Sequence, residues 1–205
     1  MRRDVESNGG SCFGGYRAAG KCALNSVIET ARLILRPFEL SDAGVVRELA
    51  GHRKIAETTL RVPHPYEAGM AESWIESLTL GRKNGGIYAY AICKNGSGGL
   101  LGTCSLAPDR AHRNAEISYW IGVPFWNMGF GTEACRAMIC EGFNTLDIDK
   151  IYAVHFASNP ASGRLMQKIG MKIEGVLRQH VVKWDVPQDL VYYGILRKEF
   201  DPEDP

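Results

Sequence analysis

The chain has 205 residues, of which 45% are hydrophobic and 23% are charged, close to the composition of an average soluble globular domain. Its 24 basic and 23 acidic residues leave a formal net charge of +1, which provides no electrostatic footprint for a nucleic acid or an anionic membrane. Because no run of 18 apolar residues occurs and the first residues lack an apolar core, we expect neither a membrane span nor a secretory signal.

The six cysteines and five histidines are scattered, and no C-x-x-C pair occurs. We therefore expect no metal site. Four of the cysteines lie inside apolar runs and are expected to be small buried residues. This usage suits a reducing cytoplasm, which is the predicted location.

The chain divides into three parts by composition. Residues 1–27 contain five glycines and few branched apolar residues, so we expect a flexible N-terminal extension there. A single domain is predicted over residues 28–200, followed by a short tail at 201–205. No internal repeat or later linker is present.

Hydrophobic periodicity and turn residues predict the elements of this domain in chain order. Strands are expected at 30–38, 87–94, 100–107, 115–123, 149–157, 171–183 and 190–198. Helices are expected at about 42–49, 67–80, 132–146 and 160–169, while 52–66 is irregular with proline breakers. The NGSGG turn predicts a hairpin between the second and third strands. The resulting fold class is α/β: a mixed α+β sheet with helices packed on it.

A glycine-containing loop, WNMGFGT at 126–132, lies between a central strand and a helix. The first N–H groups of a helix lack partners and carry the positive end of its dipole, and glycine allows close approach. The loop is therefore either a pyrophosphate site or an ordinary strand–helix turn. Gly129, Gly131 and Ala134 also match a dinucleotide fingerprint, but Asp149 precedes the next strand instead of ending it, so we reject that alternative.

Two further positions are candidates for chemistry. Asn159 and Ser162 open the helix after the next strand; they cap it, and both could also face a ligand in the neighbouring loop. Glu116 lies inside an apolar strand, where a carboxylate is costly unless it reaches water, a partner or a task. Burial would suit Glu116 to accept a proton near pH 7, whereas a strand-end position would leave it in solvent. His155 is interpreted as a core residue.

The runs YWIGVPFWNMGFGTEA and NPASGRLMQKIGM resemble the acetyl-CoA-binding segments of the GNAT superfamily of N-acetyltransferases, and more narrowly its RimJ/RimL-like branch. TARLILRPF, VPHPYEAGMAESWI and DLVYYGILRKEF extend the resemblance over about residues 30–200. It implies the acyl-CoA N-acyltransferase fold, with about seven strands and about four helices. The fourth and fifth strands, here 115–123 and 150–157, would splay apart around the pantetheine arm of acetyl-CoA.

The resemblance also implies roles for individual residues. Backbone groups of Ile121, Gly122 and Val123 would pair with the pantetheine amides, and a strand N–H would polarise the thioester carbonyl. Glu116 would be the general base, acting directly or through water. Ser162 would protonate the leaving thiolate. Further cofactor contacts would come from Asn127, Met128, Gly129, Phe130, Gly131, Thr132 and Asn159. Branch members often carry Lys or Arg where this chain has Met128, so one cation beside the pyrophosphate is missing.

The function implied is acetyl transfer from acetyl-CoA to a primary amine, without a metal, by direct attack of the amine. Neutralising a lysine ammonium at pH 7 costs about 4.6 kcal/mol, against about 1.1 kcal/mol for an α-amine, so a weak base favours the N-terminal amine of a protein or peptide. The alternatives are a small-molecule amine acceptor and a non-catalytic acyl-CoA-binding module. The protein would act as a monomer or homodimer, without nucleic acid or membrane partners.

Overall fold

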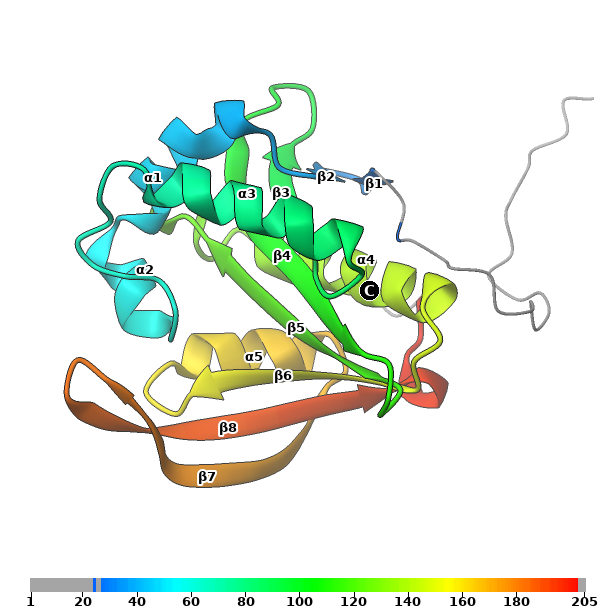
Figure 1. The fold of residues 1–205 in the computed structure, drawn as a ribbon. Helices are drawn as coiled ribbons and strands as arrows, with labels where there is room; N and C mark the ends of the chain where they lie inside the picture. The colour runs from blue at the N-terminus through cyan, green and yellow to red at the C-terminus, as the bar shows by residue number, and fades with distance from the viewer. Residues whose placement is uncertain (1–23, 25–26, 203–205) are drawn as a thin grey trace, which may run out of the picture.

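The computed structural model describes Leu24 and residues 27–202. This part of the chain forms one open eight-stranded sheet in the order β1-β2-β3-β4-β5-β6-β8-β7 (Figure 1). The strands are β1 Ile28–Glu29, β2 Leu33–Arg36, β3 Tyr88–Lys94, β4 Leu100–Asp109, β5 Asn114–Ile121, β6 Lys150–Phe156, β7 Lys172–Lys183 and β8 Val186–Leu196. All neighbours pair antiparallel except β5 and β6, which are parallel.

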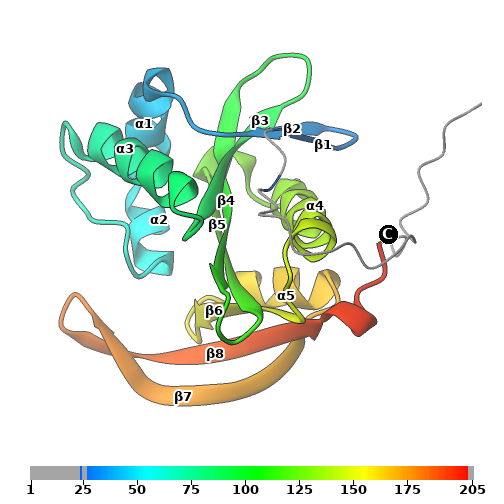
Figure 2. The same ribbon diagram turned by 45° about the vertical axis from the view of Figure 1, so that its right-hand side comes forward.

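Five α-helices cover the two faces of the sheet. They are α1 Ala43–Ala50, α2 Arg53–Thr58, α3 Met70–Lys83, α4 Phe130–Thr145 and α5 Pro160–Lys168. Helices α1 to α3 lie on one face of β3 to β5, and α4 lies on the opposite face (Figure 2). None of the helices in the described part of the chain is long and apolar enough to cross a membrane.

Alternation along β5 gives each face its own core. Ile117 and Ile121 belong to the larger core, which α4 and α5 cover, whereas Trp120 belongs to the smaller core beneath α1 and α3. Side chains two residues apart share a face of a strand. Glu116 and Ser118 therefore lie on the same face as Trp120, beside α1 to α3.

The parallel pairing of β5 with β6 is short. It joins Asn114 to Lys150, Ala115 to Ile151 and Glu116 to Tyr152, and then stops although both strands continue. In Figure 2 the free ends of β5 and β6 diverge. The predicted splaying of these two strands is confirmed, and it begins at Glu116.

The fold class, the hairpin of β3 and β4, and the start of α5 at Pro160 are confirmed. The sheet has one more strand than predicted, because the two-residue β1 pairs with β2. Helix α2 was not predicted, and α3 begins at Met70 instead of residue 67 because Gly69, with a φ of 86°, interrupts the helical backbone before it. Helix α4 likewise begins two residues early, after Gly129.

Most of the predicted flexible extension, residues 1–27, lies outside the described residues, as do residues 203–205. Leu24 is an exception within it. This side chain is 3% exposed and belongs to the larger core, and its carbonyl accepts a hydrogen bond from Arg82. The packed domain therefore includes this position, four residues before the predicted boundary.

Candidate active site

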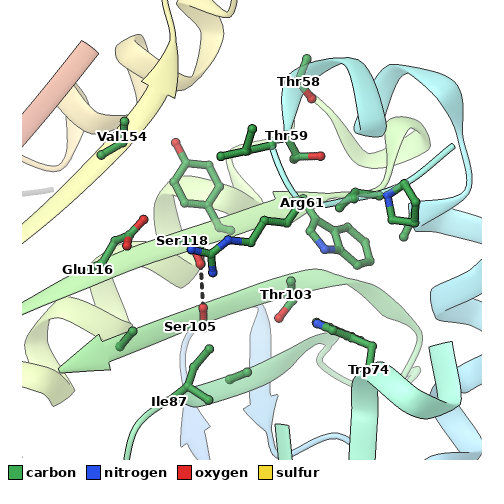
Figure 3. Close-up of a pocket in the computed structure, with 18 of the residues that line it drawn as sticks. Thr58, Thr59, Arg61, Trp74, Ile87, Thr103, Ser105, Glu116, Ser118 and Val154 are labelled. Carbon is green, nitrogen blue, oxygen red and sulfur yellow. Dashed lines mark hydrogen bonds between the residues drawn. The ribbon is translucent and has the colours of Figure 1, made fainter. Parts of the chain in front are cut away.

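A pocket of about 1160 Å³ lies between the α1–α3 side of the sheet and the splayed strands. Residues of β4, β5 and β6 form its floor, and the segment joining α2 to α3 forms one wall (Figure 3). Its lining extends from Glu116 and Tyr152, where β5 and β6 separate, to His155 and Met166 beneath the gap. The pocket is therefore open to both faces of the sheet where β5 and β6 diverge. Two substrates could enter such a site from opposite faces.

Glu116 lines this pocket at the point where the strands part. Its residue is half-buried, and in Figure 3 its carboxylate is directed into the cavity. Tyr152 lies opposite it in the parallel register. Burial raises the pKa of the Tyr152 phenol, and the nearby negative charge of Glu116 raises it further. Glu116 is the third residue of β5, and it lines a cavity within the fold.

The gap between the strands exposes backbone hydrogen-bonding groups of β5. Gly122 N–H donates to Leu101 O of the neighbouring chain segment at 2.8 Å, so Gly122 is directed toward β4. Because alternate residues of a strand point their N–H and C=O to opposite edges, Ile117, Tyr119 and Ile121 are directed toward β6. The Glu116–Tyr152 pair still uses Ile117 N–H, because Glu116 itself is directed toward β4. The Ile117 carbonyl, both main-chain groups of Tyr119 and Ile121 N–H are therefore the groups that face the gap and can bind the amides of an extended ligand.

This arrangement changes which backbone groups are available to pair with the pantetheine amides. Both main-chain groups of Gly122 are already used, since its carbonyl accepts from Phe125 N–H at 2.9 Å. The Ile121 carbonyl accepts the indole N–H of Trp126 at 2.6 Å, which fixes the start of the glycine loop against β5. The Val123 carbonyl accepts from Trp126 N–H at 3.3 Å, so Ile121 N–H and Val123 N–H remain as candidates from the predicted set. The Ile117 carbonyl and the main-chain groups of Tyr119 are additions.

The glycine loop ends in a helix N-terminus. Gly129 is the N-cap of α4 with a φ of 79°, and Asn127 also has a left-handed φ, of 62°. Asn127, Met128 and Gly129 are exposed, so the loop that precedes the first N–H groups of α4 is open to solvent. The geometry fits a pyrophosphate.

Gly131 has a different role from Gly129. A Cβ at Gly131 would lie 2.9 Å from Leu165 Cδ1 and 3.4 Å from Ile121 Cγ1, inside the core. The glycine therefore allows α4 to pack closely against α5 and β5. Replacing Gly131 by Val would test this packing as much as the anion site.

Glu133, in the first turn of α4, ties this helix to the segment before β2. Its carboxylate accepts from Thr30 Oγ1 at 2.6 Å, from Arg32 N–H at 2.9 Å and from Arg32 Nε at 2.6 Å. Burial opposes ionisation, but these bonds outweigh it and hold the pKa of Glu133 below its usual value. Arg32 also donates to Met128 O at 3.0 Å, so the same contact holds the anion loop in place.

The start of α5 lies across the gap. Asn159 Oδ1 accepts from Ser162 N–H at 3.4 Å, which confirms the predicted N-cap. The Ser162 hydroxyl shares a 2.7 Å hydrogen bond with Tyr119 Oη, and Tyr119 Oη also donates to Ser162 O at 3.3 Å. Burial raises the pKa of Tyr119 and keeps it a neutral phenol. Sequence reasoning missed Tyr119, although its position three residues after Glu116 places it on the opposite side of β5.

The remaining candidates, His155, Cys104 and Cys135, are buried side chains of the fold. His155 is 8% exposed; its Nδ1–H donates to Phe156 O at 2.7 Å, and burial lowers its pKa. Cys104 and Cys135 are buried with their sulfurs 3.8 Å apart, and burial raises the pKa of Cys135. A neutral thiol is a poor nucleophile. Among the described residues, no three His, Cys, Asp or Glu side chains gather as metal ligands do.

The sequence matches the acetyltransferase (GNAT) domain over residues 32–172. The chain belongs to the GNAT family. It is 30% identical to the Bacillus subtilis protein named "Uncharacterized N-acetyltransferase YoaA" over 178 residues, covering 83% of this chain and 97% of that protein. It is 35% identical over 107 residues to B. subtilis "Putative ribosomal N-acetyltransferase YdaF", covering 52% of this chain and 58% of that protein.

A solved structure shows the same fold. RimL, a ribosomal alpha-N-protein acetyltransferase in complex with coenzyme A, is 18% identical and matches with a TM-score of 0.74, covering 83% of this chain and 97% of that one. The protein is therefore an acetyl-CoA-dependent N-acetyltransferase with the mixed GNAT sheet. The RimJ/RimL-like resemblance found in the sequence is confirmed.

Proposed function

We propose that this N-acetyltransferase acetylates the α-amine of a protein or peptide, with Glu116 as the general base. The single observation that carries the proposal is the position of Glu116, which lines the pocket at the last paired position before β5 and β6 diverge. A base there is close to both the amine side of the pocket and the backbone groups that face the gap. The relatives' names that mention ribosomal acetyltransferases support a protein acceptor.

The residues present fit acetyl-CoA, which supplies the acetyl thioester. The first-turn N–H groups of α4, next to Gly129 and Thr132, would hold its pyrophosphate, and the gap-facing backbone of Ile117 to Ile121 would hold the pantetheine amides. A strand N–H directed into this gap stabilises negative charge on the carbonyl oxygen under attack. Positioning and this stabilisation carry most of the rate, so no cysteine nucleophile is required.

Two side chains are placed to exchange hydrogen with the reacting groups, one on each side of β5. Glu116 accepts the proton that the acceptor amine loses, directly or through a water. On the other side of β5, the Ser162 hydroxyl can donate a hydrogen bond toward the departing sulfur, and its 2.7 Å hydrogen bond with Tyr119 Oη orients it. Because burial raises the pKa of Tyr119, this residue stays a neutral phenol and positions Ser162 without giving up its own proton. Ser162 and Tyr119 thus act as one unit.

The acceptor class is tested by measuring thiol release from acetyl-CoA with matched peptides. One peptide has a free N-terminal amine and no lysine, and the other is N-terminally blocked and has one lysine. At pH 7 we expect kcat/KM to favour the free α-amine by about tenfold or more, because deprotonating it costs about 3.5 kcal/mol less. The preference should narrow as pH rises and the lysine amine becomes neutral.

Two results would contradict the proposal. An equal or reversed preference at pH 7, or turnover confined to polyamines, would assign another acceptor class. Saturable acetyl-CoA binding without thiol release for any amine would favour the non-catalytic module instead. Thiol release without acceptor is the baseline for both peptides.

A further inference from the structure

An arginine without a protein partner lies in the acceptor side of the pocket. Arg61 is on the segment that joins α2 to α3, and it lines the same cavity as Glu116. In Figure 3 its side chain reaches into the cavity. Ser118, whose hydroxyl is hydrogen-bonded to Ser105 at 2.8 Å, lines the same cavity. Within the described part of the chain, the Arg61 guanidinium takes part in no hydrogen bond or ion pair.

Four other arginines among the described residues have carboxylate partners: Arg32 with Glu133, Arg36 with Asp42, Arg53 with Glu57, and Arg113 with Asp147 and Asp149. Arg47, Arg110, Arg164 and Arg178 resemble Arg61 in forming no ion pair within the described part of the chain. Among these unpaired arginines, Arg61 is the one that lines the substrate pocket. A guanidinium is matched in shape and charge by a carboxylate, which it can bind through two parallel hydrogen bonds.

One lysine binds the backbone carbonyls of the residues before and after Arg61. Lys183, at the end of β7, donates to Leu60 O at 3.2 Å and to Val62 O at 2.8 Å. Burial lowers the pKa of Lys183, as expected for an ammonium enclosed by this contact. Arg61 lies between the two held carbonyls, so its backbone is fixed while its side chain extends into the cavity.

The neighbouring hydroxyl groups are already hydrogen-bonded, so Arg61 is the group that is available to bind an anion. The hydroxyls of Thr58 and Thr59 donate to main-chain carbonyls of α2, at 2.9 Å and 2.7 Å, and are already used. Trp74 borders the same part of the cavity and adds an aromatic wall (Figure 3). The acceptor side therefore presents one cation, Arg61, and two carboxylates: Glu116 at the reaction centre and the exposed Glu67 on the same segment as Arg61.

We propose that Arg61 binds a carboxylate of the acceptor, so that the preferred substrates carry an acidic group in addition to the amine that is acetylated. This inference rests on the proposed function and specifies the acceptor further. An amine at Glu116 and a carboxylate at Arg61 would each meet a group of opposite charge. The carboxylate is either the α-carboxylate of a free amino acid or an acidic side chain close to a peptide N-terminus.

The test compares acid and amide forms of otherwise identical acceptors. One pair is serine and serinamide; the other is Ser-Asp-Ala and Ser-Asn-Ala, both with amidated C-termini. For wild-type enzyme, kcat/KM should favour the acid in at least one pair by about tenfold or more, the effect of one hydrogen bond to a charged group. A preference in only the first pair identifies the α-carboxylate, and a preference in only the second identifies the side chain.

Arg61→Gln should bring the acid-to-amide ratio close to one, mainly through KM of the acid, while kcat/KM of the amide stays within about twofold of wild type. Arg61→Lys should recover part of the preference. The control is Arg47→Gln, an exposed arginine on α1 outside the pocket, which should leave the ratio unchanged.

The outcomes separate this inference from the proposed function. Acetylation with a wild-type ratio near one, or a ratio that Arg61→Gln does not change, would overturn the role of Arg61 and leave acetyl transfer to amines intact. Absence of thiol release with every acceptor would overturn the proposed function, and this inference with it.

Discussion

Replacing Glu116 with Gln is expected to lower kcat by about 10²- to 10⁴-fold, the usual effect of removing a general base. The affinity for acetyl-CoA should stay within about twofold, because Glu116 lies on the acceptor face of β5 and not at the helix N-terminus. The two readouts are thiol release at saturating substrates and acetyl-CoA binding by calorimetry. Wild-type activity should fall as pH is lowered, since more of the acceptor amine is then protonated and cannot attack the thioester.

The matched control is Glu67→Gln, which removes the same charge from another residue of the pocket lining. Glu67 is exposed on the segment before α3, away from the point where β5 and β6 part. The kcat of the Glu67→Gln enzyme should therefore stay close to that of wild type. If Glu116→Gln had the wild-type kcat at several pH values, Glu116 would have no role in proton transfer. An equal loss in both variants would indicate a general effect of pocket charge.

The second large effect is expected at Met128, which precedes the N-cap of α4. Its side chain is 52% exposed, so a charged replacement costs little stability. If the loop holds the pyrophosphate, Met128→Arg should strengthen acetyl-CoA binding and Met128→Glu should weaken it. We expect the two dissociation constants to differ by about tenfold or more at low ionic strength. The difference should shrink near 1 M salt, where the screening length falls to about 3 Å.

Leu80 provides the control for this pair. It is 62% exposed on α3, on the other side of the sheet, so Leu80→Arg and Leu80→Glu add the same charges far from the loop. These two variants should bind acetyl-CoA equally. Equal affinity of the two Met128 variants at low salt would place the pyrophosphate elsewhere.

Local signals explain which elements were predictable from the sequence. Asn159 and Pro160 predicted the start of α5 because capping acts within one turn, and Asn159 does cap it. Helix α2 has no such signal: its N-cap is His52, whose ring Nδ1 accepts from Lys54 N–H at 3.2 Å. Histidine is not among the residues that usually mark a helix start.

The hairpin of β7 and β8 also lacks a local sequence signal that predicts it. Its turn consists of Trp184 and Asp185, with φ of 50° and 62°, and contains no glycine to mark it. Pro187 lies in the part of β8 that pairs with β7 beyond the end of β6, before the predicted start of the strand at residue 190. A proline is tolerated there because one edge of the strand has no neighbour.

The site was predictable where one strand or one turn defines it. Glu116 stood out as a carboxylate in an apolar strand, and the alternation of β5 placed it. The pairing of Tyr119 with Ser162 joins residues 43 positions apart. The support of Arg61 depends on Lys183, more than 120 positions away from the carbonyls that it binds. Neither contact leaves a local pattern, because each arises only when the sheet and its hairpin close around the pocket.

The central claim is that the gap between β5 and β6 receives the arm of acetyl-CoA, and amide hydrogen–deuterium exchange tests it most directly. Without ligand, the N–H groups of Tyr119 and Ile121 face the gap and should exchange quickly. Saturating acetyl-CoA should slow exchange in segments 117–121 and 129–133, and leave the outer strand segment 172–178 unchanged. Unaltered exchange across 117–121 with acetyl-CoA bound would contradict the claim.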